Sequence, residues 1–187
     1  DNGVWQQLHQ HRCNGDHSMI TGCFNDLNVV IFAATDILRF SPTAQQESIA
    51  RFYRALAMYW LLDFFDQVPY RDPGESTLLQ ARVRKGLEAL DYIIGEIDDV
   101  MQNLPDGPAT LPNKDAAKVL LMKCYLNKGV YANRHSPTFQ ASDMNEVIRL
   151  ADEVINSNRY SFSNNYFDNF APGNTTIGKE NIFTQEN

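Results

Sequence analysis

Apolar residues recur along the chain at alternating steps of three and four, the spacing that places them on one face of a helix. The first such stretch runs from Gly22 to Phe40, and the second runs from Pro42 to Phe65. Proline is favoured at the first position of a helix, and Thr43 with the glutamine three residues later matches a capping box. The pattern therefore predicts two long helices separated by a short turn.

Three further helices follow a turn segment rich in proline and glycine at residues 68–74. The third has an apolar stripe that begins at Val83, and the fourth begins at an Asn113 cap and ends at Gly129. Ser142 is the expected cap of the fifth helix. The apolar face of that helix consists of Met144, Val147, Ile148, Ala151, Val154 and Ile155. Five amphipathic helices joined by loops predict an all-α assembly.

Long helices in adjacent pairs suggest helical hairpins, the unit of tetratricopeptide repeats. The fourth and fifth helices contain a loose echo of that unit, formed by Leu121, Tyr125, Gly129, Tyr131 and Ala151. No strict period of roughly 34 residues exists, so a helical bundle without repeats stays open as the alternative. We predict an all-α fold of tetratricopeptide-like helical hairpins (an α-α superhelix) with irregular loops and an extended C-terminal tail.

The chain divides into three parts of one domain. Residues 1–21 form a loop-rich N-terminal segment, residues 22–157 form the five-helix scaffold, and residues 158–187 form an irregular, packed segment rich in aromatic and asparagine residues. Aromatic residues on the helical stripes are expected to belong to the core. These residues are Phe52, Trp60, Phe64, Tyr125 and Tyr131.

Composition narrows the range of functions. With 187 residues and 43% hydrophobic content, the chain can bury a sizeable core. A net charge of −7 leaves no broad basic face for phosphates, which excludes a function centred on nucleic acid. Three cysteines cannot all pair within one chain, and Cys124 lies in an apolar helical stretch where a buried free thiol is common. No disulfide framework is expected.

The longest unbroken apolar run falls far short of the roughly 20 residues that a membrane-spanning helix needs. The chain begins at Asp1 without a signal peptide or a lipidation cysteine, and it stops after a polar tail. We expect both ends to be cut from a longer parent, with any export signal removed or upstream.

Side chains of the zinc-ligand type gather near the N-terminus: His9, His11, Cys13, His17 and Cys23. Structural zinc sites pair their ligands two to four residues apart in two separated clusters, and neither cysteine here has a close cysteine partner. We therefore expect no metal and no other cofactor.

Asp63 and Asp66 could be read as a catalytic pair, because glycosidases work through two carboxylates across a cleft. The spacing of three residues is equally typical of a solvated helix end. The chain contains no His-Glu-x-x-His motif, no glycine-rich phosphate loop and no evident nucleophile with a histidine base. We expect no enzymatic activity.

Trp5 differs from the aromatic residues on the helical stripes, because it precedes a polar stretch from Gln10 to Thr21. Sugar rings present apolar C–H faces, so an exposed indole beside amide and carboxylate side chains can form a carbohydrate platform. Trp5 is therefore a candidate stacking residue.

Several segments resemble the SusD/RagB family of surface glycan-binding lipoproteins. The helix at residues 51–60, with the sequence Arg-Phe-Tyr-Arg-Ala at its start, leads into Val68-Pro69 and is similar to that family's Arg-aromatic-x-Arg-Ala helix and Gly-x-Val-Pro turn. Residues 116–121 resemble its alanine-rich helix, and residues 180–183 resemble its Glu-x-Ile-Phe strand. The resemblance extends over nearly the whole chain.

The resemblance implies a tetratricopeptide-like protein that captures an oligosaccharide or polysaccharide without catalysis. Family members work beside a SusC-like TonB-dependent transporter on the extracellular face of a Gram-negative outer membrane, held by a lipid anchor that would lie outside this chain. The candidate sugar-binding residues are Trp5, His9, Asn14 and Asp16.

The chain departs from the family pattern at three positions. Asp66 stands where the family has glycine, so aspartate must tolerate the backbone conformation of that turn or avoid it. Cys13 and Phe24 stand where many relatives have tryptophan, so sugar contacts cannot be transferred to them. Two other functions stay open: a helical-repeat adaptor that binds a protein partner, and a hydrolase with a carboxylate pair in a cleft.

Overall fold

The computed structural model describes residues 3–174 and 178–184 of the chain. Within these ranges the chain is mainly helical, with one small antiparallel β-hairpin. The elements in chain order are α1 (Val4–His9), α2 (Ser18–Leu38), α3 (Ala44–Phe65), β1 (Gln67–Tyr70), β2 (Arg82–Lys85), α4 (Gly86–Val100), the 3-10 helix η1 (Met101–Asn103), α5 (Lys114–Ala132), α6 (Ala141–Asn156) and the 3-10 helix η2 (Tyr166–Phe170).

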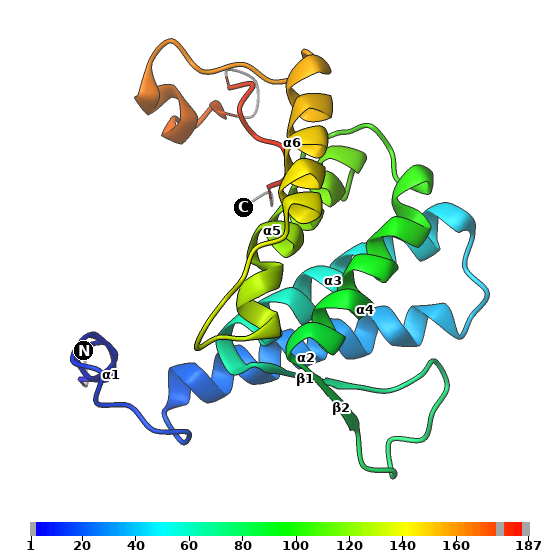
Figure 1. Cartoon of the computed structure of the whole chain (residues 1–187), viewed down its shortest axis with the longest axis vertical. Helices are drawn as coiled ribbons and strands as arrows, with labels where there is room; N and C mark the ends of the chain where they lie inside the picture. Colours follow the sequence, from blue (N-terminus) through cyan, green and yellow to red (C-terminus); the bar gives the residue numbers. More distant parts are fainter. Residues whose placement is uncertain (1–2, 175–177, 185–187) are drawn as a thin grey trace.

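Consecutive long helices pack against one another, so that α2 lies on α3, α3 on α4, α4 on α5 and α5 on α6 (Figure 1). The prediction of an all-α fold built from helical hairpins is confirmed. Two of the three predicted caps, Thr43 and Asn113, are present as well. The Thr43 hydroxyl accepts a hydrogen bond from the Gln46 backbone N–H at 3.3 Å, and the Gln46 side-chain oxygen accepts one from the Thr43 backbone N–H at 3.0 Å. Asn113 Oδ1 accepts a hydrogen bond from the Ala116 backbone N–H at 2.9 Å.

Several predicted boundaries were wrong. The N-terminal segment contains α1, and α2 begins at Ser18 rather than Gly22. Helix α6 begins at Ala141 after a Gln140 cap, so Ser142 lies inside its first turn. These first turns mix polar and apolar residues and contain no fully buried side chain, so the period of the apolar residues does not show where they begin.

Val83 belongs to strand β2 and not to a helix, which corrects the predicted third stripe. Strands β1 and β2 pair antiparallel from Gln67 opposite Lys85 to Tyr70 opposite Arg82. The hairpin is held by side chains as well as by the ladder: the Arg84 guanidinium lies 3.4 Å from the Tyr70 ring centroid. Strands of four residues are too short for a clear alternating pattern, so the sequence did not reveal them.

The core lies between α3, α4 and α5, whose facing side chains are almost fully excluded from water. The most completely buried large apolar side chains are Phe52, Leu61, Leu62, Val68, Leu90, Ile93, Ile97, Leu104, Leu121 and Leu150. Cys124 is buried among them, and burial raises the pKa of its thiol to about 12. The prediction of a buried, unpaired thiol is confirmed.

Some apolar residues that were predicted to be buried are exposed. Phe64 is 56% exposed near the end of α3, where it stacks on the half-buried Trp60 with ring centroids 5.4 Å apart. Ile148 and Ile155 are also exposed, because α6 packs mainly against α5, and Leu150, which the predicted stripe omitted, is buried in their place. A terminal helix with one neighbour buries only part of its apolar surface.

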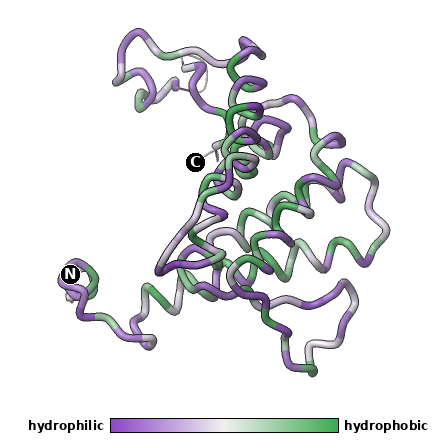
Figure 2. The backbone as a smooth tube through the Cα atoms, viewed as in Figure 1, coloured by the Kyte–Doolittle hydropathy of each residue, from purple (hydrophilic) through white to green (hydrophobic). Residues whose placement is uncertain are grey.

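Helix α2 is apolar around most of its circumference, although only one of its faces packs against α3. Figure 2 shows hydrophobic and hydrophilic positions alternating along the helices of the stack. By length and mean hydropathy, α2 is the one helix of the described part of the chain that could cross a membrane, and the core helices of soluble proteins and signal sequences pass the same test. The sequence argument from unbroken apolar runs overlooked this helix.

The C-terminal segment is attached to the helical stack at two places. Asp115 on α5 is buried and accepts a hydrogen bond from the Tyr160 hydroxyl at 3.0 Å. Asn113 donates to the Ile182 carbonyl at 2.8 Å, and the Phe183 ring meets the Phe52 ring edge-on at 5.4 Å. These contacts carry residues 178–184 back across the core helices.

The aromatic residues between these two attachments project into solvent, which corrects the prediction that the segment is packed throughout. Phe162, Tyr166, Phe167 and Phe170 are all more than two-thirds exposed. Tyr166 contacts both phenylalanines of η2, and the segment extends away from the helices (Figure 1). Residues 175–177 and 185–187 of this predicted segment lie outside the described residues.

Candidate functional site

The predicted sugar-binding residues lie on α1 and on the loop that joins it to α2. Helix α1 has no buried residue and projects away from the helical stack (Figure 1). Its attachment is local: His17, the N-cap of α2, is 7% exposed, and its Nε2 lies 3.3 Å from the Val4 carbonyl oxygen. When Nε2 carries the proton, it donates to that carbonyl and ties the two helices together.

An open cavity of about 810 Å³ lies between α1 and the following loop. Asn14 and Asp16, two of the predicted residues, line this cavity, and the Asn14 side-chain oxygen accepts the Asp16 amide at 3.2 Å. The other two predicted residues lie on α1 outside the lining. Trp5 is 62% exposed there, and His9 is exposed as well.

The cavity also contains polar residues that the sequence argument missed: Gln6, Gln7, Gln10 and Arg12. Gln6 and Gln7 lie on α1, and Gln10 is its C-cap residue. Their side-chain amides both donate and accept hydrogen bonds, as sugar hydroxyls do. The sequence shows these glutamines directly after Trp5, but they indicate a shared binding surface only once residues 4–9 are known to form a helix.

The zinc-ligand side chains of this region do not converge. Among residues 3–174 and 178–184, no three His, Cys, Asp or Glu side chains are close enough together to hold a metal ion. His17 is directed toward the Val4 carbonyl, and Cys13 lies exposed at the cavity.

Asp63 and Asp66 stabilise the end of α3. Asp63 accepts a hydrogen bond from the Tyr131 hydroxyl at 2.7 Å, and Asp66 accepts one from Arg134 Nε at 3.0 Å. The backbone of Asp66 adopts the left-handed conformation with φ of 55°, so aspartate tolerates the position that is glycine in the family pattern. Both carboxylates therefore join the end of α3 to the end of α5 and the residues after it.

Burial and its hydrogen bonds raise the pKa of the Tyr131 hydroxyl, which keeps it protonated as the donor to Asp63. Phe24 packs edge-on against Phe65 with ring centroids 5.2 Å apart. This ring belongs to the contact between α2 and α3.

Comparison with known proteins links this arrangement to a family. No protein-family model matches the chain. The starch-binding protein SusD of Bacteroides thetaiotaomicron is 27% identical over 143 residues, which cover 75% of this chain and 24% of SusD. This similarity over three-quarters of the chain agrees with the resemblance to the SusD/RagB family.

Two solved structures have the same fold. A protein crystallised with a xylogluco-oligosaccharide superposes with a TM-score of 0.79 at 18% identity, over 95% of this chain and 37% of that one. A SusD-like carbohydrate-binding protein of Bacteroides fragilis superposes with a TM-score of 0.75 at 18% identity, over 91% and 34% of the two chains. The chain spans about a quarter of the length of SusD and about a third of the length of each solved relative.

Proposed function

We propose that the protein captures oligosaccharides by non-covalent binding and catalyses no reaction. The observation that carries the proposal is the similarity to starch-binding SusD over three-quarters of the chain. Of the two solved structures with the same fold, one contains a xylogluco-oligosaccharide and the other is a SusD-like carbohydrate-binding protein.

The cavity between α1 and the loop before α2 is the proposed sugar site. Its volume of about 810 Å³ lies within the range of about 300–1,000 Å³ that small-molecule sites occupy. Asn14 and Asp16 are proposed to bind sugar hydroxyls, and the exposed Trp5 and His9 rings to contact sugar units that extend beyond the cavity.

Such a site supports weak and tolerant binding. Ring stacking depends on the C–H face that most pyranoses share, and hydrogen bonds to hydroxyls largely replace bonds to water. An open cavity also leaves both ends of a glycan chain free, as the passage of a longer substrate to a second protein requires.

We further propose that this second protein is a SusC-like TonB-dependent transporter in a Gram-negative outer membrane, with the protein held on the extracellular surface by a lipid anchor outside this chain. The proposed transporter contact is the loop from Arg134 to Gln140 together with the outer face of α6. The loop is exposed throughout and contains Phe139, and Ile148 and Ile155 add exposed apolar surface on α6. Replacing these three residues by serine should abolish co-purification with the transporter, and unchanged co-purification would refute this contact.

Affinity electrophoresis in gels that contain single polysaccharides tests the sugar-binding function. We expect retardation by at least one polysaccharide, and less retardation for Trp5→Ala and Asn14→Ala. Phe40→Ala is the matched control, because Phe40 is an equally exposed aromatic residue at the far end of α2. Absence of retardation on every polysaccharide would refute glycan capture and favour the protein-binding adaptor. Equal loss in Phe40→Ala would refute the assignment of the site to α1.

A further inference from the structure

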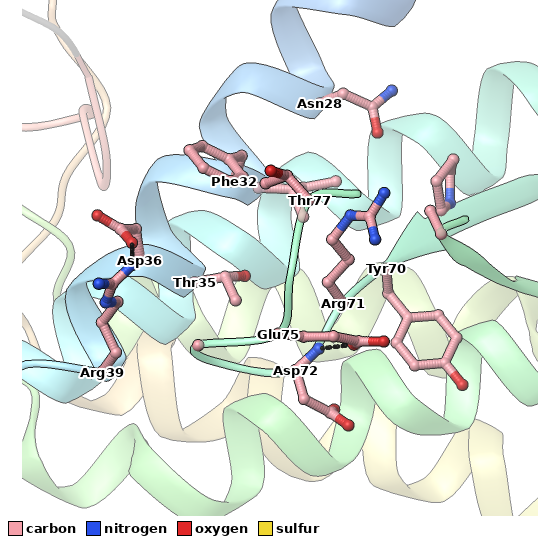
Figure 3. Close-up of a pocket in the computed structure, with 14 residues that line it drawn as sticks. Asn28, Phe32, Thr35, Asp36, Arg39, Tyr70, Arg71, Asp72, Glu75 and Thr77 are labelled. Carbon is pink, nitrogen blue, oxygen red and sulfur yellow. Dashed lines mark hydrogen bonds and ion pairs between the residues drawn. The ribbon is translucent and has the colours of Figure 1, made fainter. Parts of the chain in front are cut away.

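A second, smaller cavity lies between α2 and the loop that joins β1 to β2 (Figure 3). We name it the hairpin groove. Its volume of about 240 Å³ is below the range of about 300–1,000 Å³ for drug-sized ligands, so it suits one ring with its substituents. Helix α2 contributes Asn28, Phe32 and Thr35, and the loop contributes Arg71, Glu75 and Thr77.

Phe32 gives the groove an aromatic wall. The ring is 54% exposed, whereas Ile31 beside it is buried against the core. A phenylalanine held on a rigid helix with a free face offers a stacking surface at little cost in conformational entropy, because the helix already fixes its backbone.

Arg71 differs from the other charged residues of the groove. Asp36 pairs with Arg39 at 3.0 Å, and Asp72 and Glu75 both pair with Arg82, at 2.6 and 2.8 Å. Arg71 has no ion pair with any carboxylate of the described residues. One of its N–H groups donates to the Ser76 carbonyl at 3.1 Å, which fixes the side chain across the loop toward α2 (Figure 3).

A guanidinium has five N–H donors in a planar fork, and this fork matches a carboxylate in two parallel hydrogen bonds. Arg71 therefore presents an oriented cation with unused donors at the mouth of a cavity of sugar-ring size. Asn28 adds an acceptor, because its amide nitrogen already donates to the Phe24 carbonyl at 2.8 Å and its oxygen remains available. An acceptor suits a sugar hydroxyl.

We propose that the hairpin groove binds one uronic-acid unit of a glycan, with the pyranose ring on Phe32 and the carboxylate on the Arg71 guanidinium. The inference rests on the proposed glycan-binding function and adds to it a class of sugar and a second site. The three carboxylates that line the groove are paired with Arg39 or Arg82. Exposed charges farther away than the Debye length, about 8 Å at physiological salt, are largely screened.

The test compares a galacturonic-acid trisaccharide with its methyl ester, which has the same rings and no charge. Calorimetry at physiological salt should give the acid an affinity about tenfold higher than that of the ester, a ratio that corresponds to 1.4 kcal/mol. Arg71→Gln should abolish this ratio by weakening the acid alone. Arg71→Lys should retain part of it, because lysine keeps the charge but lacks the fork. Phe32→Ala should weaken both ligands.

Two control variants separate the site from general effects. Lys85→Gln removes the same charge from an exposed residue of β2 outside the groove, and Val29→Ala shortens an exposed side chain on α2 that does not line it. Both should bind as the unchanged protein does, and circular dichroism should give all variants the same helical content.

Equal affinity for acid and ester, or equal weakening by Arg71→Gln and Lys85→Gln, would overturn the proposed groove specificity. If neutral oligosaccharides still bind in a Trp5-dependent manner in that case, the proposed function stands and only the groove inference fails. If the unchanged protein binds neither acidic nor neutral glycans, both proposals fail.

Discussion

The buried ion pairs between α3 and α4 give the sharpest prediction about stability. Arg51 and Arg54, the two arginines of the family-like helix, both bind Glu96 on α4. Arg54 Nε donates to one carboxylate oxygen at 2.7 Å, and Arg51 Nη2 donates to the other at 2.8 Å. Arg54 and Glu96 are each 5% exposed. The pattern explains why two arginines three positions apart occur on one face of a core helix.

Glu96→Gln leaves the two arginines in different situations. Arg51 keeps an ion pair with Asp99 at 2.8 Å, whereas Arg54 loses the one carboxylate with which it forms an ion pair among the described residues. Removing one charge of a buried ion pair costs about 3–5 kcal/mol, because the other charge stays buried without a counter-charge. We expect the free energy of unfolding to fall by about this amount, which is a large share of the roughly 5–15 kcal/mol of an ordinary domain.

Urea unfolding followed by circular dichroism measures the effect, with Glu88→Gln as the matched control on the same helix. Glu88 is exposed, and its nearest cation lies 3.9 Å away, so its loss should change stability by less than about 0.5 kcal/mol. The double variant Arg54→Met with Glu96→Gln should recover most of the loss, because no charge is left without a partner. A loss below about 1 kcal/mol for Glu96→Gln, or a double variant less stable than the single one, would refute the reasoning.

Three further predictions concern the C-terminal segment and the loop after α5. Asn113→Ala should destabilise the protein by about 2–3 kcal/mol in urea unfolding, because it removes a helix cap and the donor to the Ile182 carbonyl. Asn113→Asp should restore the cap alone. Gly129→Ala would place a Cβ 2.2 Å from the Thr138 backbone oxygen, so the loop after α5 must move away. Hydrogen exchange in residues 133–140 should therefore become faster, and unchanged exchange would contradict that close approach. The Ser163 backbone N–H donates a hydrogen bond to the Glu180 carboxylate and lowers its pKa below the ordinary 4.5. The ionised carboxylate therefore stabilises the folded chain above pH 4.5, and this stabilisation is lost as the pH falls through the lower pKa of the folded state. Hydrogen exchange in residues 157–170 should therefore be faster, relative to the unfolded chain, at about pH 3 than at about pH 6, and Glu180→Gln should remove this difference.

The candidate sites were only partly predictable. Asn14 and Asp16 were identified from composition near an unassigned tryptophan, and they do line one cavity. The glutamines of the same cavity were missed because their shared surface depends on α1 being helical. The hairpin groove was missed entirely, since Phe32 and Arg71 meet only when the loop folds back over α2.

The sequence by itself determined the helical scaffold of this protein. The spacing of apolar residues marked all five long helices, and the chemistry of Thr43 and Asn113 marked two of their starts, because these signals act within a few residues. Tertiary structure alone decided which apolar residues are buried, where the C-terminal segment attaches and where cavities open. Asn113 and Ile182 lie 69 positions apart, and no local pattern encodes such a contact. This hydrogen bond forms because polar groups that packing removes from water must find hydrogen-bond partners, and only the packed helices determine which groups these are.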